Sequence, residues 1–145
     1  MNKFVEKYGQ ILLPLITPYN EDESINYENY AKLIDYVIEN DLCDSLIVTG
    51  TTGEASLCTF EERVKLFQIA VKAAAGRKPV IAGTGCASTQ ETIALTNEAV
   101  KAGIETVLVV CPFYNKPTQE GIYLHYKKLA ENTTCLLYTS DAADE

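Results

Sequence analysis

The chain has 145 residues, of which 47% are hydrophobic and 22% are charged, and its formal net charge is −8. This composition is typical of one globular domain, and no apolar run approaches the ~20 residues of a membrane helix. The acidic balance argues against nucleic acid or an anionic membrane as a partner. The first ten residues, MNKFVEKYGQ, lack the apolar core of a signal peptide, so we expect a cytoplasmic protein.

Short apolar runs alternate with segments of helical periodicity along the chain. The expected strands are residues 10–16, 45–50, 79–83 and 106–110. The expected helices are residues 26–39, a helix that opens at Thr59, a helix from Ser88 to about 102, and residues 119–132. Thr59 and Ser88 each precede a glutamate by three residues, which is the spacing of a capping box.

These elements form four successive βα units. The strands are apolar on both faces, as buried parallel strands are. Such a series builds either a doubly wound open sheet or part of a (βα)8 barrel. Both folds place their chemistry on the loops at the C-terminal ends of the strands, so these four loops hold the candidate site residues.

The first three loops differ in what they offer. Residues 17–26 are polar and acidic, which indicates a solvated turn. TGTTGEAS, from Thr49 to Ser56, places two glycines around two threonines, so backbone N–H groups and hydroxyls there can hold an anion. A tight turn with a capping threonine is the alternative. GTGCAST, from Gly83 to Thr89, fails the dinucleotide fingerprint, and we expect its glycines to serve close packing.

The fourth loop, CPFYNKPTQEG from Cys111 to Gly121, carries the adjacent aromatic residues Phe113 and Tyr114. A tyrosine hydroxyl at a strand end can move protons, although a packing role is the alternative. Lys116 lies in a polar stretch and is interpreted as a solvated surface charge. We expect His125, in the following helix, to be a surface or interface residue.

The five cysteines form no CxxC pair, and the chain has a single histidine. This pattern argues against a zinc site, and we expect reduced thiols that serve as small apolar residues.

The segments VTGTTGEAS, PVIAGTG and CPFYNKPTQEG, in this order and spacing, closely resemble the dihydrodipicolinate synthase family of pyruvate-dependent class I aldolases. The resemblance runs from about Leu12 to about Thr133. It implies an α/β fold consisting of the N-terminal half, four βα units, of a (βα)8 TIM barrel. It also implies that pyruvate forms a Schiff base with a lysine and then attacks aspartate semialdehyde, on the route to diaminopimelate and lysine.

The resemblance also implies residue roles. Gly50, Thr51 and Thr52 match the loop that binds the pyruvate carboxylate, and Thr51 is also a proton-relay hydroxyl. Tyr114 matches the relay tyrosine that reaches into a neighbouring subunit, which implies a homo-oligomer, a dimer of dimers. Proton relays of this kind suit enamine formation and aldol addition. The resemblance implies no metal and no organic cofactor.

The family's lysine-inhibition site is matched at Glu91 but not at the other positions of its neighbourhood, which argues against lysine feedback. Those positions hold Ala55, Ser56, Arg63 and Ala87.

The last eleven residues, Cys135 to Glu145, read CLLYTSDAADE. The family has a fifth strand here, and its tyrosine completes the relay. The family's spacing puts that tyrosine near Ser140, so Tyr138 comes about two residues early. The stretch resembles a translated sequencing-library adapter instead. We therefore expect a truncated aldolase domain over residues 1–134 and a non-native tail over residues 135–145, with an unusual natural C-terminus as the alternative.

The family's Schiff-base lysine lies on its sixth strand, so the resemblance implies that this chain lacks it. A half barrel also leaves a parallel strand edge uncovered. We expect the isolated chain to be inactive and to be poorly soluble or self-associating. Two alternatives stay open: an N-acetylneuraminate or keto-deoxy sugar-acid aldolase of the same family, and a non-catalytic βα module that uses GTTGE to bind an anion.

Overall fold

The computed structural model describes residues 3–138, which form a five-stranded sheet in which every pair of neighbours is parallel. The strands are β1 (Leu12–Pro14), β2 (Ser45–Val48), β3 (Val80–Gly83), β4 (Thr106–Leu108) and β5 (Leu136–Tyr138). Their order in the sheet follows their order in the chain. The C-terminal ends of all five strands therefore meet at one edge.

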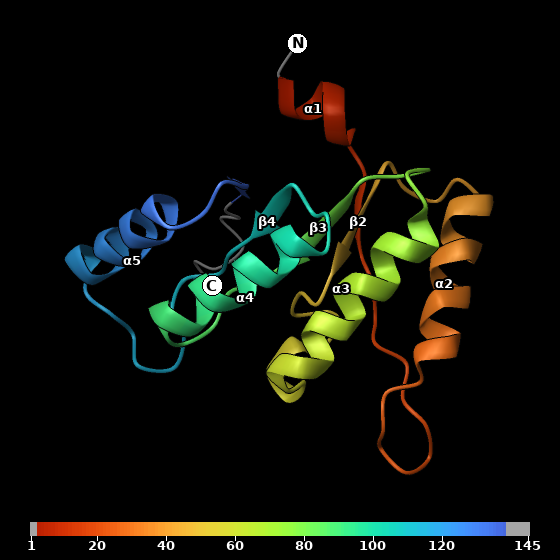
Figure 1. The fold of residues 1–145 in the computed structure, drawn as a ribbon, viewed down its shortest axis with the longest axis horizontal. Coiled ribbons are helices and arrows are strands. Elements are labelled where there is room, and N and C mark those ends of the chain that lie inside the picture. The colour runs from red at the N-terminus through yellow and green to blue at the C-terminus, as the bar shows by residue number, and fades with distance from the viewer. Residues whose placement is uncertain (1–2, 139–145) are drawn as a thin grey trace.

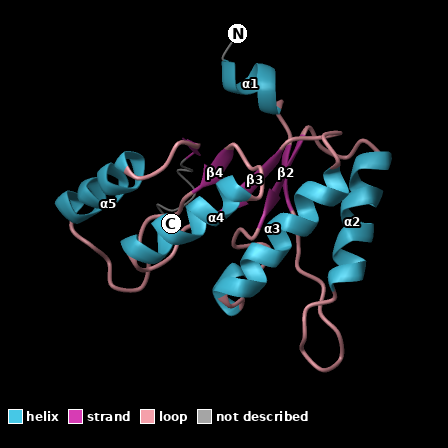
Figure 2. Cartoon of the chain, in the orientation of Figure 1, coloured by secondary structure: helices cyan, strands magenta, loops and turns pink. Residues whose placement is uncertain are grey.

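Four helices connect the strands and lie along one face of the sheet (Figures 1 and 2). They are α2 (Tyr27–Glu39), α3 (Phe60–Ala74), α4 (Thr89–Lys101) and α5 (Gln119–Glu131). A short helix, α1 (Lys3–Tyr8), precedes β1, and a 3-10 turn, Ala55–Leu57, lies between β2 and α3. Within residues 3–138, no helix has both the length and the apolar character needed to span a membrane.

The four predicted βα units are confirmed. The helix predictions hold because their capping signals are used: the Thr59 hydroxyl accepts from the Glu62 N–H, and the Glu62 carboxylate accepts from the Thr59 N–H. The first strand, predicted over residues 10–16, is shorter than predicted. The backbone N–H groups of Gln10 and Ile11 both donate to the Asp44 carboxylate at 2.8 Å instead of to a neighbouring strand.

The main core lies between the sheet and the helices. The side chains that are fully buried there are large and apolar, so each amphipathic helix is held by its contact with the sheet. They include Tyr30, Ile34, Leu46, Val48, Leu66, Phe67, Leu95, Val107 and Leu129.

The other face of the sheet has a smaller cluster, made by Tyr8 of α1 with Ile47 and Ile81. The Ser45 hydroxyl donates to the Tyr8 carbonyl at 2.6 Å, and the Tyr8 hydroxyl is hydrogen-bonded to the Thr106 hydroxyl. Helix α1 was not predicted from the sequence. Its only local signal is the i, i+4 spacing of Phe4 and Tyr8, whose rings are 4.7 Å apart.

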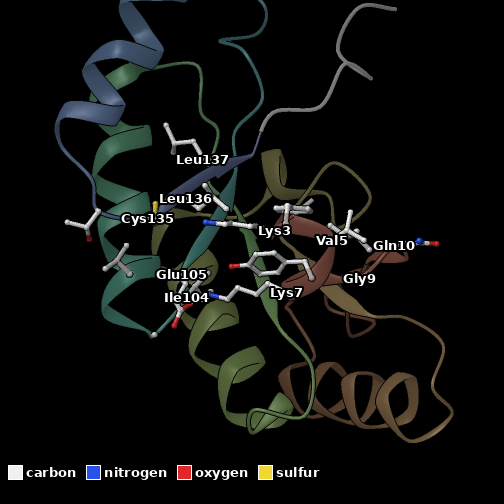
Figure 3. Close-up of a pocket in the computed structure, with 16 residues that line it drawn as sticks. Lys3, Val5, Lys7, Gly9, Gln10, Ile104, Glu105, Cys135, Leu136 and Leu137 are labelled. Carbon is white, nitrogen blue, oxygen red and sulfur yellow. Dashed lines mark hydrogen bonds and ion pairs between the residues drawn. The ribbon is translucent and has the colours of Figure 1, made fainter. Parts of the chain in front are cut away.

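A cavity of about 1260 Å³ lies between α1, the start of β1 and β5 (Figure 3). Lys7 forms an ion pair with Glu105 beside it, and Leu136 of β5 is 51% exposed. This cavity lies at the N-terminal ends of the strands. It is therefore at the opposite edge from the loops that the sequence singles out.

Candidate functional site

The loop after β2 is a tight hydrogen-bonded turn. The Gly50 carbonyl accepts from the Gly53 N–H at 3.1 Å, and the Thr51 carbonyl accepts from the Glu54 N–H at 3.0 Å. Glu54 has a left-handed backbone with φ 53°, which reverses the chain into the 3-10 turn. Thr51 and Thr52 are exposed at the tip of this turn. Their hydroxyls are thus free of the core and available to a ligand.

Gly53 allows the turn to pack against the end of β1. A Cβ at this position would lie 2.9 Å from the Leu15 carbonyl oxygen. The buried Thr17 hydroxyl donates to the Gly53 carbonyl at 2.6 Å. Only glycine fits this approach of two backbones, so the second glycine of GTTGE fixes where the turn sits.

The glycines of the third loop also serve close packing, as predicted. A Cβ at Gly83 would lie 2.4 Å from the Thr49 carbonyl oxygen, and a Cβ at Gly85 would lie 2.8 Å from the Val110 nitrogen. The ends of β2, β3 and β4 are therefore held together through backbone contacts.

A pocket of about 290 Å³ lies at this edge of the sheet. Gly50, Thr51 and Ser56 line it from the β2 loop, and Phe113 lines it from the β4 loop. Arg63 of α3 contributes a buried guanidinium. The pocket combines an apolar wall with hydroxyls, backbone and a cation, an arrangement that suits a small organic anion.

Tyr114 does not line this pocket, although its neighbour Phe113 does. Tyr114 is 92% exposed and has a positive φ of 71°, which is uncommon for an aromatic residue. The pocket lining includes Gly50 and Thr51 but not Thr52 or Tyr114. Of the four residues singled out from the sequence, the structure thus brings two together at the pocket.

Three residues that the sequence analysis did not assign to the site hold its loops. They are Thr17, Thr49 and Arg63, and all three are buried. Thr49 could have been singled out because it is a polar residue directly after an apolar strand. No local pattern marks an arginine in the first turn of a helix as buried.

The expectation that His125 is a surface or interface residue is wrong. His125 is 3% exposed, and its Nδ1 is hydrogen-bonded to the Thr89 hydroxyl at 2.9 Å. It lies on α5 and faces the start of α4, where the two helices pack on each other. Burial lowers the pKa of His125.

The cysteines are all free, and burial raises the pKa of the Cys43, Cys58 and Cys86 thiols. These three groups are therefore protonated at neutral pH and are poor nucleophiles. Among residues 3–138 no three His, Cys, Asp or Glu side chains gather in a way that could hold a metal ion.

Comparisons with known proteins agree on one family. The sequence profile of the dihydrodipicolinate synthetase family matches residues 7–143. The 4-hydroxy-tetrahydrodipicolinate synthase of Bacillus velezensis is 45% identical over 126 residues, covering 87% of this chain and 43% of that protein. The enzyme of the same name from Neisseria meningitidis serogroup B is 50% identical over 123 residues, covering 85% and 42%. The chain thus spans less than half the length of these curated relatives.

Solved structures give the same result. The crystal structure of dihydrodipicolinate synthase from Aquifex aeolicus aligns with a TM-score of 0.85 at 43% identity, covering 89% of this chain and 43% of that one. N-acetylneuraminate lyase from Mycoplasma synoviae aligns with a TM-score of 0.87 at 22% identity, a likeness of fold alone. The prediction of an N-terminal TIM-barrel half is confirmed. Since the profile match spans nearly the whole chain, this protein belongs to the dihydrodipicolinate synthetase family.

Proposed function

We propose that this chain carries the pyruvate-binding loop of a 4-hydroxy-tetrahydrodipicolinate synthase. That enzyme would condense pyruvate with aspartate semialdehyde through a lysine Schiff base. The observation that supports this proposal best is the pocket of about 290 Å³ beside the Gly50–Thr51 turn, at the C-terminal edge of the sheet. In a TIM barrel this edge is where the active site forms.

Within this proposal each of the four residues has a physical role. The Gly50–Thr52 turn binds the pyruvate carboxylate through backbone N–H groups and hydroxyls. The Thr51 hydroxyl relays a proton during enamine formation and aldol addition. Tyr114 joins the relay of a neighbouring subunit, since its ring extends into solvent from this one. We assign no Schiff-base role to Lys116, which is exposed and does not line the pocket.

The complete enzyme is proposed to be a cytoplasmic homo-oligomer, a dimer of dimers, that needs no metal or organic cofactor. The Schiff-base lysine and the last relay tyrosine come from the part of the family barrel beyond the first four βα units. Neither group belongs to the pocket's lining here. We therefore propose that the 145-residue chain is inactive by itself.

We further propose that residues 135–145 are derived from a sequencing adapter and that the aldolase sequence proper ends near Thr134. The pairing of β5 with β4 is compatible with either origin, because a parallel ladder uses backbone groups that any extended segment offers. Residues 139–145, including Ser140 at the position of the family's relay tyrosine, lie outside the described residues. Long sequencing reads through the source locus test this proposal. A stop codon directly after the codon for Glu145 would overturn it.

The function is tested by expressing the complete reading frame and treating it with pyruvate and borohydride. We expect one reduced pyruvate adduct on a lysine, and condensation with aspartate semialdehyde rather than with sugar aldehydes. The 145-residue chain is the matched control, and it should remain unlabelled. Labelling of that short chain would disprove its inactivity, and a complete product that condenses only sugar aldehydes would move the function to the sugar-acid aldolases.

A further inference from the structure

Arg63 is a buried cation with no acidic partner. Arg63 is 7% exposed, and none of the ion pairs among residues 3–138 includes it. Its Nη2 donates to the Gly83 carbonyl at 2.8 Å, and its Nη1 donates to the Cys86 sulfur at 3.3 Å. Its Nε is buried without a hydrogen-bond partner. A buried charge that is bonded only to neutral acceptors is costly. We therefore expect Arg63 to have a role that offsets this cost.

Thr49, which also donates to the Gly83 carbonyl, has an unfavourable backbone conformation. It is a β-branched residue at φ 52°, a backbone region that such residues rarely adopt. Its side chain is 2% exposed, and its hydroxyl donates to the Gly83 carbonyl at 2.8 Å. Gly83 thus accepts from both Thr49 and Arg63, and its Cα approaches the Thr49 backbone too closely for any side chain.

We propose that Thr49, Gly83 and Arg63 form a clamp that positions the Gly50–Thr51 turn for its ligand. Thr49 directly precedes this turn, so its left-handed backbone sets the direction in which the turn leaves β2. Arg63, on α3, holds the Gly83 carbonyl in place by a hydrogen bond, and the Thr49 hydroxyl donates to the same carbonyl. Thr49 and Arg63 are positioning residues in this scheme. The ligand, a small carboxylate, rests on the proposed function, whereas the clamp itself does not.

Hydrogen exchange tests the clamp in the 145-residue chain without any activity. The amides to follow are those of Gly53 and Glu54, which close the turn. Thr49→Val and Arg63→Met should each raise their exchange about tenfold, the effect of losing one strong hydrogen bond. Thr49→Ser and Arg63→Lys, which keep a donor, should stay within about threefold of the parent.

Two controls separate the clamp from general destabilisation. Arg77→Met removes an arginine that is paired with Asp35 away from the turn, and it should leave these amides unchanged. The double variant Thr49→Val/Arg63→Met should exchange like the faster single variant, because both side chains act on one carbonyl. If Arg63→Met also speeds hydrogen exchange at the amides of β2, it has loosened the sheet as a whole. The comparison of Thr49→Val with Thr49→Ser then tests the clamp by itself.

Unchanged exchange in Thr49→Val, or fully multiplicative effects in the double variant, would overturn the clamp. The link to the ligand is tested in the complete enzyme. There Thr49→Val should raise KM for pyruvate about tenfold while kcat stays within about twofold. Faster exchange with an unchanged KM would leave the clamp standing and would remove pyruvate as the ligand of this turn.

Discussion

Substitution of Gly83 by alanine should destabilise the chain strongly, and the structure gives the size of the effect. The new Cβ would lie 2.4 Å from the Thr49 carbonyl oxygen, whereas ordinary contacts begin near 3.4 Å. The backbone on one side must therefore move by about 1 Å. Because both sides are buried strand ends, we expect a loss of about 3 kcal/mol, the upper part of the range for overpacking.

Two other glycines serve as controls because their substitution by alanine should change the stability differently. Gly121, in the first turn of α5, has room for a Cβ at 3.4 Å from its nearest neighbours, so Gly121→Ala should stabilise the chain by about 0.5 kcal/mol. Gly76 has no atom within 4 Å but a φ of 73°, so Gly76→Ala should cost about 1 kcal/mol from backbone strain alone.

Urea unfolding followed by far-UV circular dichroism measures all three variants, at a concentration where size-exclusion chromatography shows a single species. The order of stability should be Gly121→Ala, parent, Gly76→Ala and Gly83→Ala. A Gly83→Ala variant as stable as the parent would refute the close approach of β2 and β3. A Gly121→Ala variant less stable than the parent would show that these Cβ distances do not predict whether a substitution stabilises or destabilises the chain.

Three further predictions concern catalysis, capping and pH. In the complete enzyme, Thr51→Val and Tyr114→Phe should each lower kcat about 100-fold while the fold is retained, as steady-state kinetics and circular dichroism would establish, and a loss below threefold would exclude a relay role. Thr59→Ala should cost about 1 kcal/mol in urea unfolding because α3 loses its N-cap, whereas Thr59→Ser should cost little. Burial lowers the pKa of His125 below 6.5, so the unfolded chain binds the proton more readily and stability should fall as the pH drops below about 6.5. His125→Gln should flatten that dependence in unfolding experiments across this range, and an unchanged slope would show that another group causes it.

The candidate site was predicted in part from the sequence. GTTGE marks Gly50 and Thr51 because glycines and hydroxyl residues directly after a buried strand can hold an anion, although a tight turn with a capping threonine has the same pattern. The same loop of sequence gave no sign that Thr49 has a positive φ, since this conformation depends on Gly83 from another strand. His125 was misplaced because a lone histidine in an amphipathic helix has the same local pattern whether its face is covered or open.

Local patterns in the sequence determined the elements of this protein. These patterns are apolar runs of four to six residues, helical periodicity and the capping signals at Thr59 and Ser88. Because each depends only on residues close together in the chain, it can be recognised from the sequence alone. They established four βα units and the loops that follow the strands.

Tertiary structure alone decided what meets at the strand ends. The parallel register brings Gly83 opposite the end of β2, and α3 brings a buried arginine to the same carbonyl. Likewise, α1 packs against the sheet through contacts between residues about one hundred positions apart in sequence, such as that between Tyr8 and Thr106. Such contacts are formed by chain segments that share no local pattern, which is why only the folded molecule shows how the Gly50–Thr51 turn is held.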